Sequence, residues 1–447
     1  MSIMSTGDPA WALTAVAIAV IGLVVMIAWG KMQPLLAFVI AAIAAALMLG
    51  MPLGAIPKSV EKGIGDMLGS LAVLLALGAV FGKVIADSGA AQKIAKVLVR
   101  LFGASRMPIA LSLTGFIVGI PLFYNVGFVL MVPLIFSLVR QSGKGVVYIA
   151  IPLMAGLSIA HGFLPPHPSP TAIVPMFGAD MGLTLIYGLI VGIPTLMVAG
   201  PLFAMRVKNI QGNPPDLFVS PPREDHELPG AFNSFATALL PVALLAGATA
   251  FSFSGTVPPE HKPLVDFLSH PILVLLIALL VAVFTVGIAR GQSFQALMES
   301  SASAIREIAP ILLIIAGAGA LKQVFIDSGV SAQLGESLRT LPVPPLVLGW
   351  LIAGIIRVAL GSATVAGLTA AGLVAPLVAV SGVDPNLMVL AIGAGSLMFS
   401  HVNDSGFWMF KAYFGLSIKD TLKSWTLMEG AVGIAGLISV LVLDIFV

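Results

Sequence analysis

Short polar side chains interrupt two long apolar stretches of this chain. Tyr124 and Asn125 lie in the sequence Gly119-Ile-Pro-Leu-Phe-Tyr-Asn-Val-Gly127, and Ser362 and Thr364 lie in Gly361-Ser-Ala-Thr364. Their hydroxyl and amide groups, together with freed backbone N–H groups, could bind the carboxylate and hydroxyl groups of a small solute. Capping of helix ends by the same side chains is the alternative. We predict the binding role for all four residues.

Arg357 lies inside the apolar run that leads to the second interruption. A buried cation within a membrane segment is costly unless it is paired or faces water. Because the guanidinium group suits bidentate binding of carboxylates, we predict that Arg357 contacts an anionic solute. A structural pair with Asp404, or an interaction with a helix C-terminus, is the alternative.

Two further polar clusters contain titratable groups. One is His161-Gly-Phe-Leu-Pro-Pro-His167-Pro-Ser-Pro170, and the other is Ser400-His-Val-Asn-Asp-Ser-Gly406. Histidine titrates near neutrality, and burial can bring a carboxylic acid into the same range. The predicted proton-coupling residues are Asp404, His161 and His167, whereas a lone histidine could equally serve helix packing. The predicted solute contacts in the second cluster are His401, Asn403 and Ser405.

Other classes of site are disfavoured by the same residues. His161 and His167 are six positions apart without a carboxylate partner, so we expect no metal site and no cofactor. No cysteine is present, which excludes disulfides and thiolate chemistry. The net charge is +2, without a basic cluster of the kind that binds nucleic acid.

Composition places these residues in a membrane. Of 447 residues, 58% are hydrophobic and 9% are charged, against about 25% charged in a soluble domain. Crossing the bilayer takes about 20 apolar residues. Runs of this kind lie at 12–29, 34–54, 68–86, 181–205, 236–254, 271–289, 308–326 and 427–446. The residues before 12 lack the cationic region of a cleavable signal, so we predict a retained first helix.

Four longer segments depart from this simple pattern. Segments 107–139 and 342–380 are too long for one span and contain helix-breaking sequence, which predicts two re-entrant hairpins. The segment 147–177 and the segment starting near 387 contain the two polar clusters, which predict broken helices. Broken backbone at membrane depth is tolerated where protein or a water-filled cavity surrounds it.

The distribution of basic residues supports a path with about ten transmembrane helices and two hairpins. On this path most Lys and Arg residues face the cytoplasm, as the positive-inside rule requires. The exceptions in outside loops are Lys58, Lys62, Lys262 and Arg339.

Several features recur at one spacing. Asp87-Ser-Gly recurs as Asp327-Ser-Gly, and His161 recurs as His401, with the hairpins and broken helices in the same register. We predict inverted-topology repeats at 12–205 and 236–446, joined by a cytoplasmic linker at 206–235. Such repeats place a solute site near the midplane and suit alternating access. Asp87 and Asp327 themselves are interpreted as turn and capping residues.

Five stretches resemble the gluconate permease family, the bacterial gluconate:proton symporters. They are Gly78 to Ala95, Gly119 to Phe128, His161 to Thr171, Arg357 to Gly367 and Phe399 to Phe407. The resemblance implies a carrier for gluconate or a related sugar acid, coupled to protons, in the bacterial inner membrane. It also implies a distant likeness to ion-coupled anion carriers with paired hairpins, which are often homodimers.

Other functions stay open at this point. A carrier of the same fold could be coupled to sodium, or could move another small carboxylate or an amino acid. An intramembrane enzyme would need a nucleophile with a base, or metal ligands at a spacing that this sequence lacks. A channel fits the broken helices less well than a carrier does.

Overall fold

The computed structural model describes residues 9–103, 106–212, 224–253, 260, 262–331, 333, 338, 340–402 and 404–447. Within these ranges the chain forms helices and no strands. Eight of the described helical segments are long and apolar enough to cross a membrane. Shorter apolar helices accompany them, as expected for a chain in which membrane segments are interrupted.

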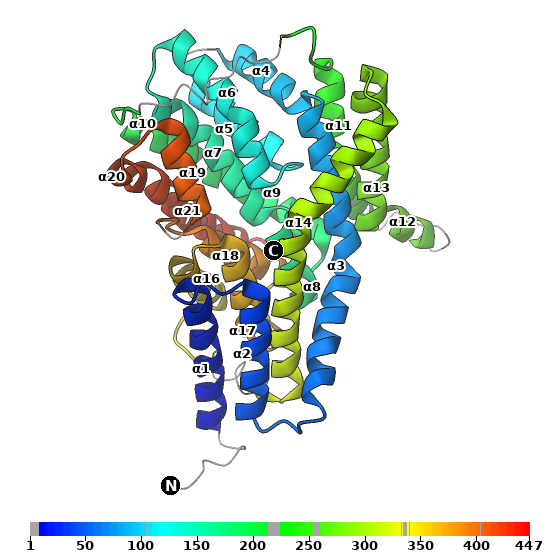
Figure 1. Ribbon diagram of the computed structural model, residues 1–447, viewed down its shortest axis with the longest axis vertical. Helices are drawn as coiled ribbons and strands as arrows, with labels where there is room; N and C mark the ends of the chain where they lie inside the picture. Colours follow the sequence, from blue (N-terminus) through cyan, green and yellow to red (C-terminus); the bar gives the residue numbers. More distant parts are fainter. Residues whose placement is uncertain are drawn as a thin grey trace.

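The helices of the first half, residues 9–212, follow one another with short connections (Figure 1). They are α1 (Pro9–Ala28), α2 (Pro34–Met48), α3 (Ile56–Asp87), α4 (Ala90–Phe102), α5 (Met107–Gly119), α6 (Tyr124–Ser142), α7 (Val146–Phe163), α8 (Pro168–Phe177), α9 (Met181–Met197) and α10 (Phe203–Val207). The π-helical turn η2 (Val198–Leu202) joins α9 to α10.

The helices of the second half, residues 231–447, show a similar order of long and short elements. They are α11 (Ala231–Phe253), α12 (Lys262–Leu268), α13 (Pro271–Ala282), α14 (Phe294–Asp327), α16 (Pro345–Leu360), α17 (Ala363–Ser381), α18 (Pro385–Leu397), α19 (Ser405–Phe414), α20 (Ile418–Thr421) and α21 (Leu427–Leu443). Two π-helical turns, η5 (Val283–Gly287) and η7 (Leu422–Thr426), continue α13 and lead into α21.

The two longest helices, α3 and α14, lie side by side (Figure 1). With 32 and 34 residues, each is about 50 Å long at 1.5 Å per residue. Glycine makes their contact close, because a Cβ at Gly63 would lie 2.3 Å from the Gly319 carbonyl oxygen. This pair therefore forms a long, closely packed element beside the shorter helices.

Both long helices begin earlier than the apolar runs predict. α3 starts at Ile56 rather than near 68, and α14 starts at Phe294 rather than near 308. In α3 the added turns bury Ile56, Ser59 and Gly63 on one face and expose the charged residues between them. Mean hydropathy over this stretch is low, so a search for apolar runs misses an amphipathic extension.

A further helix, α4, was not among the predicted elements. Its buried residues are Ala90, Ala91, Ile94, Ala95 and Leu98, which recur at helical spacing. Its lysines and Arg100 occupy the remaining positions. Such a helix packs one face against α5 and α11 and presents charge elsewhere, which explains the basic residues seen there in the sequence.

The segments 107–139 and 342–380 each form two helices with a break between them. The first breaks at residues 120–123, between α5 and α6, and the second at residues 361–362, between α16 and α17. Gly361 has φ 75°, a left-handed conformation that glycine adopts without strain. At 13 and 16 residues, α5 and α16 are shorter than the ~20 residues of a full span.

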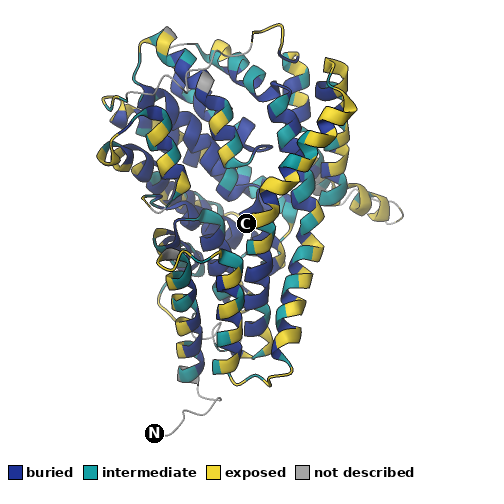
Figure 2. Ribbon diagram, in the orientation of Figure 1, coloured by how far each residue is buried: buried dark blue, intermediate teal, exposed yellow. Residues whose placement is uncertain are grey.

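The two polar clusters also break helices, as predicted. α7 ends at Phe163 and α8 begins at Pro168, and α18 ends at Leu397 and α19 begins at Ser405. Prolines account for the first break because they lack the N–H that continues a helix. α7 and α18 are almost entirely buried, and Figure 2 shows exposed residues gathered on the outer helices. The breaks therefore lie inside the molecule.

Candidate functional site

A cavity of about 810 Å³, including the open space at its mouth, lies where the α5–α6, α16–α17 and α18–α19 breaks meet. Its walls come from the start of α6, from α7, from the α16–α17 and α18–α19 junctions, from η7 and from α21.

The structure brings most of the predicted site residues to this cavity. Those that line it are Tyr124, Asn125, His161, Arg357, Ser362, Thr364, Asp404 and Ser405. His167 and His401 do not line it. Asn403 lies outside the described residues.

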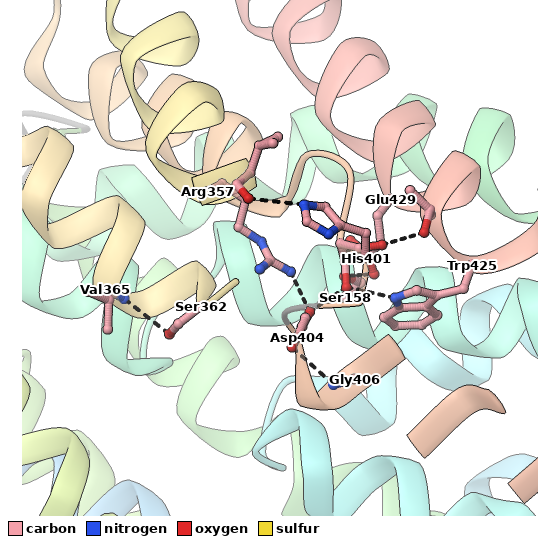
Figure 3. Close-up of polar contacts among 12 residues, drawn as sticks. Ser158, Arg357, Ser362, Val365, His401, Asp404, Gly406, Trp425 and Glu429 are labelled. Carbon is pink, nitrogen blue, oxygen red and sulfur yellow. Dashed lines mark hydrogen bonds and ion pairs between the residues drawn. The ribbon is translucent and has the colours of Figure 1, made fainter. Parts of the chain in front are cut away.

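Arg357 and Asp404 point toward one another and form an ion pair (Figure 3). This ion pair is the alternative role that the sequence suggests for Arg357. Arg357 lies in the last turn of α16 and is 3% exposed. Its Nη2 donates to Asp404 Oδ2, whereas Nε and Nη1 are buried without a hydrogen-bond partner in the described part of the chain. Two nitrogens of the guanidinium group, with three N–H donors between them, are thus without an acceptor in this conformation.

Asp404 is held by several donors in addition to Arg357. Its Oδ1 accepts from the Gly406 N–H at 3.0 Å, which caps α19, and its Oδ2 accepts from the Ser400 hydroxyl. Ser400 in turn accepts from Trp425 Nε1 at 2.8 Å. Since all these donors favour an ionised carboxylate, the geometry fits Asp404 as the counter-ion of Arg357.

The first break presents an uncapped helix start to the cavity. No side chain caps α6 at Phe123, so the N–H groups of its first turn stay free of intrahelical partners. The Tyr124 hydroxyl contacts Met154 Sδ at 3.8 Å, and its ring lies 6.2 Å from His161 and 5.9 Å from Trp425 between centroids. Asn125 is exposed to the cavity.

The helix that begins at the break between α16 and α17 has a capped N-terminus. Ser362 Oγ accepts from the Val365 N–H at 3.4 Å and so performs the capping role that the sequence left as an alternative. Ser362 and Thr364 line the cavity as well. Three helices, α6, α17 and α19, therefore begin at the cavity, and their N-termini carry partial positive charge that favours an anion.

The two predicted site histidines that do not line the cavity, His167 and His401, hydrogen-bond backbone carbonyl groups. His167 Nε2 donates to the Gly119 carbonyl at 2.7 Å, and its Nδ1 lies 3.4 Å from His161 Nδ1. His167 thus ties the α7–α8 break to the end of α5. His401 Nε2 donates to the Val358 carbonyl at 3.0 Å and faces a groove between α1 and α16 instead of the cavity.

Glu429 and Ser158 were missed in the sequence. Both line the cavity and are buried, and Ser158 Oγ lies 2.7 Å from Glu429 Oε1. Glu429 belongs to the apolar run 427–446, which the sequence pattern predicts to be a simple span. An acidic residue inside such a span is itself a sign of function, and that sign was available.

No group of three or more His, Cys, Asp or Glu residues in the described ranges is arranged to hold a metal ion. The chemistry of the cavity is that of an arginine, two carboxyl groups, hydroxyls and helix N-termini. This set suits reversible binding of a small hydroxylated anion.

Comparison with known proteins agrees with this chemistry. The model of the GntP family permeases matches residues 11–446. The high-affinity gluconate transporter of Escherichia coli K12 is 45% identical over 97% of this chain and 100% of its own length. The Gnt-II system L-idonate transporter of the same organism is 42% identical over 94% and 96% of the two chains. A gluconate permease of Pseudomonas aeruginosa PAO1 is 43% identical over 98% of both.

Two solved structures share the fold at low sequence identity. MtrF of Neisseria gonorrhoeae has a TM-score of 0.63 at 13% identity, covering 88% of this chain and 84% of its own. The YdaH transporter of Alcanivorax borkumensis has a TM-score of 0.58 at 14% identity, covering 88% of each. The family match, the relatives and the apolar helices together make this protein a multi-pass membrane permease and not an enzyme. This chain belongs to the family of GntP permeases.

Proposed function

We propose that this protein imports gluconate or a related sugar acid by proton symport across the bacterial inner membrane. One observation carries the proposal: Arg357, with two unpartnered guanidinium nitrogens, lines the same cavity as the starts of α6, α17 and α19. Positive charge with hydroxyl and amide groups around it matches an anion rich in hydroxyls. Relatives named for gluconate and L-idonate support the substrate class.

In the proposed binding mode the substrate carboxylate binds the guanidinium group of Arg357. The hydroxyl groups of the sugar acid then meet the polar side chains around the cavity, which are Tyr124, Asn125, Thr364 and Ser405. The N–H groups at the start of α6 add further donors. Each of these groups reaches the cavity from a helix end, where the backbone has hydrogen-bonding capacity to spare.

Alternating access is proposed on the basis of inverted repeats at 12–205 and 236–446, with residues 206–235 as linker. In support, α3 and α14 both end in Asp-Ser-Gly, with φ 81° at Gly89 and 77° at Gly329. The breaks between α5 and α6 and between α16 and α17 occur at matching positions, as do those after α7 and α18. We propose that the two interrupted pairs, 107–139 and 342–380, are re-entrant hairpins whose tips meet at the cavity.

Uptake of labelled gluconate into proteoliposomes tests the proposal. An outside-acid pH gradient should drive accumulation, and a sodium gradient without a pH gradient should not. L-idonate should compete with gluconate, whereas dicarboxylates and D-amino acids should compete weakly.

Equal accumulation with and without the pH gradient would overturn proton coupling. Accumulation driven by sodium would support a sodium-coupled carrier of the same fold. Stronger competition by a dicarboxylate or an amino acid would replace the sugar acid as substrate. Empty liposomes, and liposomes with a heat-denatured sample, provide the controls for leak.

A further inference from the structure

A second carboxyl group in the cavity takes no part in the arginine pair. Glu429 lies in the first turn of α21 and is 2% exposed. Its two oxygens lie 2.7 and 2.9 Å from the Ser158 hydroxyl oxygen of α7 (Figure 3). In the described part of the chain Glu429 forms no ion pair. A buried carboxyl group is therefore met by a single hydroxyl.

The hydrogen count at this contact distinguishes Glu429 from Asp404. An ionised carboxylate only accepts hydrogen bonds, and a serine hydroxyl has one hydrogen to give. With Glu429 protonated, both short contacts to Ser158 become hydrogen bonds, one in each direction. Asp404 instead accepts from a guanidinium, a hydroxyl and a backbone N–H. The cavity thus favours a charged form of one carboxyl group and a neutral form of the other.

The charged and titratable groups around Glu429 are few. α21 packs mainly against α18, α9, α7, α16, η2 and η7. From α16 and α7, Arg357 and His161 line the same cavity, and Asp404 and Tyr124 complete the titratable set there. Tyr187 of α9, Tyr148 of α7 and Lys423 of η7 do not line it. With Arg357 matched by Asp404, Glu429 is the carboxyl group there that lacks a counter-ion.

From this arrangement we infer that Glu429 carries the coupled proton; the inference rests on the proposed symport. The Glu429 carboxylate accepts a proton from the outer side to form a carboxylic acid and releases the same proton on the inner side. A substrate anion bound at Arg357 repels an ionised Glu429 in the same cavity, so anion and proton bind together. By linkage each raises the affinity for the other by the same factor.

The substitution Glu429→Gln, which keeps the shape and removes the titration, tests this inference. We expect accumulation driven by about one pH unit, up to roughly tenfold for one proton per solute, to be lost. Counterflow exchange of labelled for unlabelled gluconate should persist, because it needs no net proton movement. Glu299→Gln is the matched control, since Glu299 is an exposed residue of α14 that hydrogen-bonds only Gln295 among the described residues.

Proton uptake gives a second readout that does not depend on transport. In weakly buffered detergent solution, gluconate binding to the wild-type protein should take up to about one proton per bound anion. We expect no uptake by Glu429→Gln and wild-type uptake by Glu299→Gln.

The outcomes separate the inference from the proposed function. A wild-type protein without gradient-driven accumulation or proton uptake overturns both. A coupled wild type together with a coupled Glu429→Gln variant overturns the assignment to Glu429 alone.

If Glu429→Gln does not fold, Ser158→Ala serves as the test because it keeps the carboxyl group and removes its hydrogen-bonding partner. The pH of half-maximal uptake should then shift by roughly half a unit or more. An unchanged midpoint in Ser158→Ala would count against the assignment.

Discussion

The first and second halves of the chain supply different chemistry to the same cavity. From the first half come two aromatic rings, an amide, a histidine and a serine, on α7 and at the start of α6. From the second half come Arg357, Asp404 and Glu429, which are all the charged side chains that line it in the described ranges. The comparison teaches that similar backbone breaks can be used for different purposes: one shapes the cavity, and the other sets its charge.

The breaks are also stabilised differently. At the first, α3 approaches so closely that a Cβ at Gly82 would lie 2.2 Å from the Pro121 carbonyl oxygen, and His167 ties the neighbouring break to α5. In the second half, Ser362 caps α17 and Asp404 caps α19. Close packing therefore positions the breaks of the first half, whereas polar capping groups position those of the second half.

The largest effect is expected from removing the positive charge that the second half contributes to the cavity, which is Arg357. Arg357→Gln should lower gluconate affinity by about 100-fold or more, since charge-assisted hydrogen bonds contribute about 1.5–3 kcal/mol each. It should also destabilise the fold by up to about 3 kcal/mol, because the partly buried Asp404 loses its cationic partner and keeps only Ser400 and Gly406 as donors. Equilibrium binding and unfolding in detergent measure the two effects.

Two companion variants sharpen this result. Arg357→Lys keeps the charge but loses the planar fork, so its affinity should be intermediate. The double variant Arg357→Gln with Asp404→Asn should recover stability without recovering binding. Wild-type affinity in Arg357→Gln would mean that the second half does not hold the substrate carboxylate.

A smaller effect is expected where packing positions the first break. Gly82→Ala should destabilise the protein by about 1–3 kcal/mol and raise the KM for uptake, because the new methyl group displaces the Pro121 backbone. Gly65→Ala is the control on the same helix, since a Cβ there meets nothing within 4 Å. It should be neutral or stabilising by up to about 1 kcal/mol. Equal behaviour of the two variants would show that the close contact does not position the break.

The smallest effect is expected at the surface, where Lys93 of the first half pairs with Asp225 of the segment between the halves. Asp225 of the linker accepts from Lys93 of α4 at 3.1 Å and lies 3.8 Å from Lys96, and the Lys93 hydrogen bond holds the pKa of Asp225 below its usual range. A lowered carboxyl pKa contributes stability that is present above about pH 4 and is lost as pH falls through the lowered value.

Asp225→Asn should therefore leave transport unchanged and remove only this acid-side contribution. Unfolding midpoints at pH 7 and below pH 4, each at low and high salt, measure it. Because salt screens an exposed pair, any difference from wild type should vanish at high salt. A difference that persisted at high salt would indicate a role beyond this pair.

Much of the fold followed from local sequence. Three of the breaks contain proline or glycine, which act on the backbone where they occur, whereas the break between α18 and α19 contains neither and was indicated by its polar residues. Helix starts were less predictable, since the amphipathic turns of α3 depend on whether a neighbour covers one face. The sequence did not predict α4 for the same reason: its apolar face is stable only because α5 and α11 cover it.

Hydrophobicity and backbone chemistry are local properties, so the membrane class and the polar residues near the breaks could be predicted from the residues alone. How those residues are used depends on the tertiary structure. It paired Arg357 with Asp404, turned His401 away from the cavity, and joined Ser158 to Glu429 across 271 positions. Such contacts depend on how helices far apart in the sequence pack together, and a short sequence pattern contains no information about that packing.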